Sequence, residues 1–143
     1  MDVMTHALAL LLTLVAPGSL MPVQVEAPEY PENAVKAGMQ DTVQVVVFIG
    51  GDGSVSRAEA TSRRNPLLAS VSETAARHWR FEPSQEPTER STTLTFEYSL
   101  RIDPPAKRQC FVGPSRVTVI LPSTVQIQGW FRPPPPTVVY GKR

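Results

Sequence analysis

The stretch 65–83, NPLLASVSETAARHWRFEP, constrains the fold more than any other part of this sequence. Asn65 is a good N-cap residue, and Pro66 suits the first helical position because a missing N–H costs nothing there. Apolar residues then recur every three or four positions and mark a single face: Leu68, Val71, Ala75 and Trp79. Phe81 and Pro83 end the pattern. The sequence therefore predicts an amphipathic helix that lies on an apolar surface.

Segments on both sides of this helix have the pattern of β-strands. Residues 42–49, TVQVVVFI, are β-branched and apolar on both faces, which favours a central strand. The glycine turn 50–53 closes this strand, so 55–62 is expected to return as the second arm of a hairpin. Residues 92–102 alternate between apolar and polar side chains, and this predicts a half-buried strand.

A second, short helix is predicted before the first strand. In 30–38, Pro31 fits a first helical turn and Gly38 fits a stop. The fold class is then α+β, with two helices on one face of a three-stranded antiparallel sheet. If the three strands are antiparallel, 42–49 lies in the middle and 92–102 lies at an edge, which gives strand order 2-1-3. An edge strand has free N–H and C=O groups that can capture another strand.

Composition excludes several classes of function. A chain of 143 residues holds one small core, and its net charge of +1 gives no electrostatic case for binding nucleic acid. Cys110 is the single cysteine, so neither an internal disulfide nor a thiolate metal site can form within the chain. His6 and His78 have no second ligand at a metal-binding spacing. No metal and no cofactor are therefore expected.

The sequence also argues against an enzymatic function. The acidic residues Glu26, Glu29 and Glu32 do not form a carboxylate pair on one element, and no histidine lies near a nucleophile. The glycine turn 50–53 leads into a strand, so it offers no helix N-terminus to a phosphate. We expect no catalytic residues.

Residues 1–27 are expected to be an export signal or a weak N-terminal anchor. The apolar block 7–15, ALALLLTLV, is short for a membrane span and fits the central region of a signal peptide. Small residues suited to cleavage occur at 16–19 and again at 25–27. If the segment is not cut, it could anchor the chain, and it would then be the chain's only contact with a membrane.

The tail, 103–143, is expected to be a Pro-rich extension with a β-hairpin made of 116–121 and 125–128. The run Pro133–Pro136 fits a stiff polyproline spacer or a ligand for a groove-type domain. The hairpin has apolar side chains to bury, and two places are open to it. It can add to the edge at 92–100, which would block that edge, or it can cover the free sheet face around Val46 and Phe48.

A series of short motifs between 28 and 102 carries a family resemblance. It begins with Tyr30-Pro31-x-x-Ala34-x-x-x-Gly38 and a valine strand that closes with Ile49-x-x-Asp52-Gly53-x-Val55. It continues with Asn65-Pro66-Leu67, Ala76-x-x-Trp79-Arg80-Phe81-x-Pro83 and Phe96-x-x-x-Leu100. In this order the motifs resemble the C-terminal domain of TonB-family energy transducers. The resemblance implies a periplasmic domain, 28–102, with the helix and strand arrangement expected above.

The resemblance also implies a function and a site. Members of the family grip the TonB box, an extended peptide of an outer-membrane transporter, by adding it to their last strand. The corresponding peptide-binding residues here are Thr93, Leu94, Thr95, Phe96, Glu97, Tyr98 and Ser99, and the peptide approach region is Glu29, Tyr30 and Pro31. The expected partner is a TonB-dependent transporter or another envelope protein, and a homodimer is possible. The alternative is a structural or assembly protein of the envelope whose own tail fills the edge strand, without energy transduction.

Overall fold

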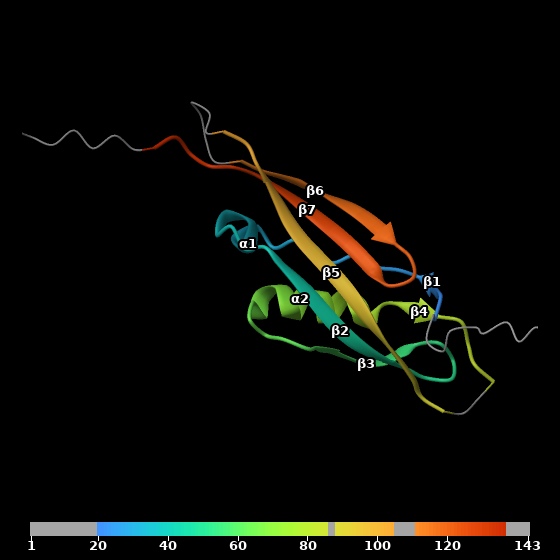
Figure 1. Cartoon of the computed structure of the whole chain (residues 1–143). Coiled ribbons are helices and arrows are strands. Elements are labelled where there is room, and N and C mark those ends of the chain that lie inside the picture. The colour runs from blue at the N-terminus through green and yellow to red at the C-terminus, as the bar shows by residue number, and fades with distance from the viewer. Residues whose placement is uncertain (1–19, 86–87, 105–110, 137–143) are drawn as a thin grey trace, which may run out of the picture.

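The computed structural model describes residues 20–85, 88–104 and 111–136. Two helices and seven strands follow one another along these residues (Figure 1). In chain order they are β1 (Pro22–Gln24), α1 (Glu32–Lys36), β2 (Asp41–Ile49), β3 (Val55–Ala60), α2 (Pro66–Arg77), β4 (Arg80–Phe81), β5 (Arg90–Ile102), β6 (Phe111–Ile120) and β7 (Thr124–Arg132). The predicted hairpin of the tail is β6 and β7, and both strands are longer than expected.

The main sheet has five strands in the order β3-β2-β5-β7-β6, and a small second sheet pairs β1 with β4. Its first three strands are antiparallel and have the predicted order, with β2 in the middle. The expectation of a three-stranded sheet with β5 at its edge is wrong. The hairpin adds to that edge, with β7 parallel to β5 and β6 outermost. Of the two places open to the hairpin, it takes the edge of the sheet.

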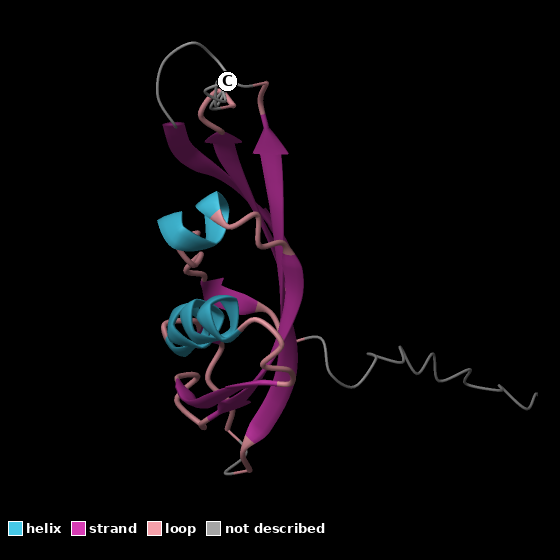
Figure 2. Ribbon diagram, turned by 90° about the vertical axis from the view of Figure 1, so that its left-hand side faces the viewer, coloured by secondary structure: helices cyan, strands magenta, loops and turns pink. Residues whose placement is uncertain are grey.

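Both helices lie on one face of the sheet, and no helix or strand among the described residues covers the other, which we call the uncovered face (Figure 2). The alternate residues of β2 that point toward the helices are fully or almost fully buried: Val43, Val45, Val47 and Ile49. Leu94, Phe96 and Tyr98 of β5 complete this layer. On the uncovered face, Val46 and Phe48 are only half-buried, and the guanidinium of Arg57 stacks 4.1 Å from the centre of the Phe48 ring. The core therefore fills the space between the helices and one face of the sheet.

The helix predicted for 65–83 ends earlier than expected, at Arg77. Trp79 continues the apolar spacing of the helix and Phe81 follows two residues later, yet Trp79 lies after the end of α2 and Phe81 lies in the short strand β4. Both side chains are in the core, and Trp79 is completely buried. Gly53 makes room for β4, since a Cβ there would lie 1.9 Å from the carbonyl oxygen of Phe81, and its φ of +85° suits glycine. Asn65 is at the N-cap position, but its side chain donates a hydrogen bond to Asp41 instead of capping the helix.

Residues 20–27 are part of the fold, although the sequence assigned them to the leader. The β1 strand pairs antiparallel with β4, and Leu20, Val25 and Ala27 pack against the core. The carbonyl oxygen of Glu26 accepts a hydrogen bond of 2.9 Å from the indole nitrogen of Trp79. The apolar block 7–15 lies outside the described residues. Among the helices that the structure describes, none has the length and apolarity needed to cross a membrane.

Candidate functional site

The predicted peptide-binding residues all lie on β5, and the structure gives this strand a neighbour on each side. Residues 90–98 of β5 pair with β2, and residues 95–102 pair with β7. The side chains of Leu94, Phe96 and Tyr98 are buried in the core, whereas Thr93, Thr95, Glu97 and Ser99 point to the uncovered face. The backbone groups that a peptide would need are therefore already used by β7 over most of the predicted site.

The contacts of β7 with β5 are those of a core strand. Val125 and Ile127 are completely buried. Gly129 lies so close to its neighbours that a Cβ would be 2.8 Å from a methyl carbon of Leu100 and 3.0 Å from the ring of Tyr30. The N–H of Thr95 donates to the carbonyl of Ser123 just before β7, over 2.8 Å. This strand is packed into the domain and does not simply rest on its surface.

A polar and aromatic cluster on the uncovered face fixes the far end of the hairpin. The carboxylate of Asp103 accepts hydrogen bonds from the Trp130 indole at 2.8 Å and from Arg132 at 3.2 Å. Burial alone would raise the pKa of Asp103, but these hydrogen bonds and the charge of Arg101 outweigh it and lower the pKa. The Phe111 ring meets Trp130 edge-on, with 5.3 Å between ring centres. The end of β5 and both hairpin strands are thus held together.

The approach region divides into a buried and an exposed part. Tyr30 is 5% exposed, and its ring meets Tyr98 edge-on with 5.2 Å between the ring centres. Its hydroxyl donates a hydrogen bond to the carbonyl of Met39, and burial raises the pKa of Tyr30 to about 12. Burial also raises the pKa of Tyr98. Glu29 is exposed, and Pro31 is the N-cap residue of α1. Tyr30 is therefore a core residue, and Glu29 is the member of this region with the most exposed side chain.

Among the strands that the structure describes, β6 is the free edge of the sheet on this side. From 114 to the end of β6, and at the next residue, Leu121, all side chains are exposed, among them Val117, Val119, Ile120 and Leu121 at 42% to 53%. A hollow lies between this strand and the loop that precedes α1. Its lining includes Pro28, Glu29, Tyr30 and Val35 on one side and Val112 to Ser115 with Val117 on the other. The structure thus brings the predicted approach region next to β6. Sequence reasoning identified the hairpin but could not identify β6 as the free edge, because either placement of the hairpin would bury its apolar residues.

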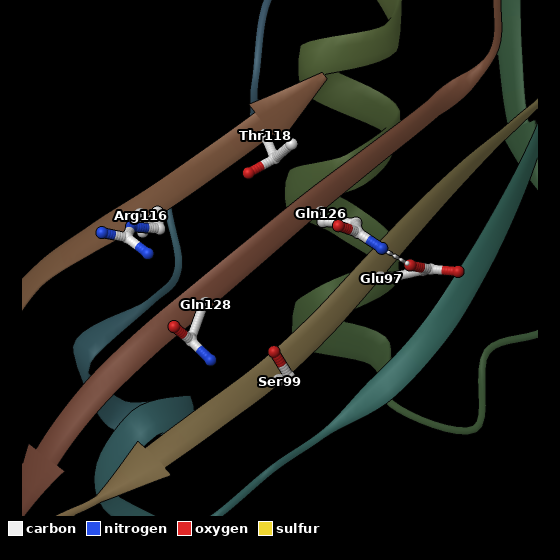
Figure 3. A pocket seen from close by; sticks show the side chains of 6 residues that line it. All are labelled: Glu97, Ser99, Arg116, Thr118, Gln126 and Gln128. Carbon is white, nitrogen blue, oxygen red and sulfur yellow. Dashed lines mark hydrogen bonds between the residues drawn. The ribbon is translucent and has the colours of Figure 1, made fainter. Parts of the chain in front are cut away.

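A second hollow lies on the uncovered face above β5, β7 and β6 (Figure 3). Six polar residues line it: Glu97, Ser99, Arg116, Thr118, Gln126 and Gln128. The amide of Gln126 donates to Glu97 over 2.8 Å. No group of three or more metal-ligating side chains occurs among the residues that the structure describes. The chemistry of this region is that of hydrogen bonding and strand pairing.

The sequence is similar to proteins of one known family. Residues 26–100 match the family model described as the Gram-negative bacterial TonB protein C-terminal domain, which is just over half of the chain. A solution NMR structure of the Pseudomonas aeruginosa TonB C-terminal domain is similar at 22% sequence identity and a TM-score of 0.46. That similarity covers 58% of this chain and 88% of the other. Among curated proteins, none matches this sequence. From the family match, the chain belongs to the TonB C-terminal family of non-catalytic, transport-coupling domains.

Proposed function

We propose that this chain is a periplasmic protein-binding module that serves energy-dependent transport by capturing an extended segment of an envelope protein on β6. The expected partner is a TonB-dependent outer-membrane transporter. Membership of the family supports this class of partner. The observation that carries the proposal is the strand order, because β7 occupies the edge of β5 and leaves β6 outermost. A strand with free backbone groups and exposed valines is suited to strand addition.

The approach region supports β6 as the strand that receives the peptide. A segment added to this edge would alternate its side chains between the two faces of the sheet. Those on the helix side would point toward the hollow lined by Pro28, Tyr30 and Val117. Glu29 is exposed at this hollow, and among the described residues it has no ion-pair or hydrogen-bond partner. Apolar side chains with a nearby cation are the chemistry that this surface would accept.

The strand that the sequence predicted as the peptide site, Thr93–Ser99, remains a second route. It could receive a peptide only if β7 left β5, and Val125 and Ile127 would then lose their complete burial. Exposing two such side chains costs about 1.5–3 kcal/mol each. A peptide would have to offset this loss before any net binding appeared. Direct addition to β6 has no such cost.

The alternative function is that of a structural or assembly protein of the envelope. The occupation of β5 by the chain's own tail favours it, because that arrangement removes the family's usual peptide strand from use. In this case the domain would contact other envelope proteins without capturing an extended peptide. A peptide-binding measurement separates the two functions.

The test uses the full chain and a synthetic peptide that carries the TonB box of an outer-membrane transporter, with binding measured by calorimetry. The matched control is the same peptide with alternate backbone nitrogens methylated, which keeps the side chains but removes the hydrogen bonds of strand pairing. We expect binding of the first peptide and at least a tenfold loss with the second. Equal binding of the two peptides would contradict strand addition, and binding of neither would support the structural alternative.

A lock on β7 distinguishes the two strands. Glu97 and Gln126 are register partners on β5 and β7 with their side chains in contact, so cysteines at these positions can be tested for a disulfide in a Cys110→Ser background. Unchanged peptide binding in the oxidised form, relative to the reduced form, is expected for addition to β6. Loss of binding that returns on reduction would instead assign the site to β5 after departure of β7.

A further inference from the structure

The second part of β6, after the shift in its pairing register with β7, is an apolar edge that lies between two prolines. Pro114 lies where the register between β6 and β7 shifts, and Pro122 lies in the turn after the strand. Of the ten exposed large apolar side chains in the described residues, four lie in the five residues 117–121. Edge strands of this kind usually carry charges that prevent pairing, but Arg116 is the only charged residue between the prolines. We define residues 115–121 as the edge segment.

This edge segment is complementary to itself in the antiparallel direction. Proline has no N–H to donate, so Pro114 and Pro122 bound the stretch that another strand can pair with. The residue midway between them is Thr118. When two copies pair antiparallel about Thr118, Val117 of each copy lies opposite Val119 of the other. These valines lie opposite Ile127 and Val125 of β7, so they project to the helix side of the sheet in both copies.

The charges of the edge segment are compatible with this pairing. Arg116 lies opposite Ile120 of the second copy, and the two arginines are four residues apart along the strands. At about 3.3 Å per residue this is roughly 13 Å, longer than the screening length of about 8 Å at physiological salt. The cross-strand pairs are therefore valine with valine and arginine with isoleucine, without like charges in opposition.

We propose that two copies of this chain pair through their edge segments, antiparallel about Thr118, to form one continuous sheet of ten strands. The helices of both copies then lie on the same side of the sheet. The pairing also regulates peptide capture, because the second copy uses the same backbone groups of β6 that a partner's peptide needs. This regulatory step rests on the proposed function. Peptide binding and dimer formation are mutually exclusive, so peptide shifts the population toward monomer.

The experiment measures sedimentation equilibrium of the full chain over a range of concentrations. Two double variants are compared with the natural sequence: Val117→Lys with Val119→Lys, and Val117→Lys with Val119→Glu. In the first, lysines oppose lysines in the proposed pairing, and in the second each lysine opposes a glutamate. Because positions 117 and 119 are 44% and 42% exposed, both variants are expected to keep the fold, which circular dichroism and thermal melting check.

We expect the natural chain to dimerise, the lysine–lysine variant to remain monomeric throughout the range, and the lysine–glutamate variant to dimerise at least as well as the natural chain. Pairing centred on Val117 or Val119 would place like charges opposite each other in the lysine–glutamate variant and make it monomeric. Dimerisation of the lysine–lysine variant equal to that of the natural chain would overturn the proposal, as would a monomeric natural chain. All three proteins share residues 1–19, so association through that segment cannot produce the difference.

Adding the TonB-box peptide separates failure of this proposal from failure of the proposed function. If both hold, the peptide binds and dissociates the dimer. A natural chain that is monomeric yet binds the peptide would reject the dimer and leave the function standing. A dimer that follows the charge pattern but neither binds the peptide nor dissociates would reject the function and leave the dimer standing.

Discussion

In the C-terminal hairpin, two residues of β6 lie opposite two residues of β7, and their environments differ completely. Ile127 and Val125 of β7 are fully buried, whereas their partners Val117 and Val119 of β6 are 44% and 42% exposed. The four side chains project to the same side of the sheet. The helical layer therefore covers Val125 and Ile127 of β7 and leaves Val117 and Val119 of β6 partly exposed. Along this part of the hairpin, β7 belongs to the core of the domain and β6 lies at its surface.

The first test measures how much a core residue contributes to stability in the part of the chain that matches the family. Trp79→Ala should destabilise the protein by about 3–5 kcal/mol and unfold much of it, because this ring is completely buried against Phe81 and Phe96. Trp79→Phe is the matched control. It loses the hydrogen bond to Glu26, worth about 1 kcal/mol, but keeps an aromatic ring. Urea unfolding measures both, and a stable Trp79→Ala variant would show that this packing is assigned wrongly.

The second test asks whether β7 belongs to that core. Ile127→Ala should cost about 3 kcal/mol and lower the midpoint of one cooperative unfolding transition, since its side chain is fully buried in the same cluster as Trp79. Fluorescence and circular dichroism should give coincident curves. Two separate transitions, with only the first one shifted, would show that the hairpin unfolds independently and that β7 is not part of the core.

The sequence predicted the family part of the fold better than the position of the tail. Apolar residues on both faces of 42–49 placed that strand in the middle, and direction alone then fixed the order of its neighbours. The end of α2 was misplaced because Trp79 keeps the spacing of the helix, although it packs into the core from the residues that follow α2. Residues 20–27 were assigned to the leader, because β1 has only three residues, the first of them a proline, and gives no periodic signal.

The candidate site was predictable only in part. The apolar alternation of β5 and the hairpin in the tail can both be read from the sequence. What the sequence does not determine is whether the hairpin's apolar face meets the helices beside β5 or the open face near Phe48, since both would remove it from water. Gly129 is a signal that could have helped. A glycine within a strand often marks close approach of another chain segment, here Tyr30 and Leu100.

The third test uses that close approach. Gly129→Ala would place a methyl group 2.8 Å from Leu100 and 3.0 Å from Tyr30, so these side chains must move. We expect a loss of about 1–2 kcal/mol in the free energy of unfolding. In a Leu100→Ala background, Gly129→Ala should lower the free energy of unfolding by less than it does in the natural chain, because the added methyl then has space. Equal losses in both backgrounds would mean that Leu100 does not limit the approach of β7.

A fourth test compares the two regions by their response to acid. The hydrogen bonds of Asp103 at the hairpin lower its pKa below the ordinary value of 3.8, and those of Glu73 from Ala60 and Arg63 lower its pKa below 4.5 against an opposing effect of burial. A pKa that is lower in the folded state adds stability above the unfolded-state value, and this stability is lost as the pH falls through the folded-state value.

Asp103→Asn and Glu73→Gln should each flatten the loss of stability between about pH 5 and pH 2, a window that brackets ordinary carboxyl pKa values. Urea midpoints at a series of pH values measure the slope. A single cooperative domain requires that both variants change the same global transition. A change confined to Glu73→Gln would indicate that the Asp103 contacts do not stabilise the folded state.

The smallest effect is expected on the outer strand, with Val119→Thr. The substitution conserves shape and introduces a hydroxyl, which water can reach at this exposed position, so the change in stability should be about 0.5 kcal/mol or less. Val125→Thr, directly opposite on β7, introduces the same hydroxyl into the core and should cost about 1–3 kcal/mol. The dimer adds a concentration dependence, because pairing through β6 would bury Val119 as well. Val119→Thr should then be nearly neutral in dilute solution and more costly at concentrations where the chain pairs, whereas the cost of Val125→Thr should stay the same at both concentrations.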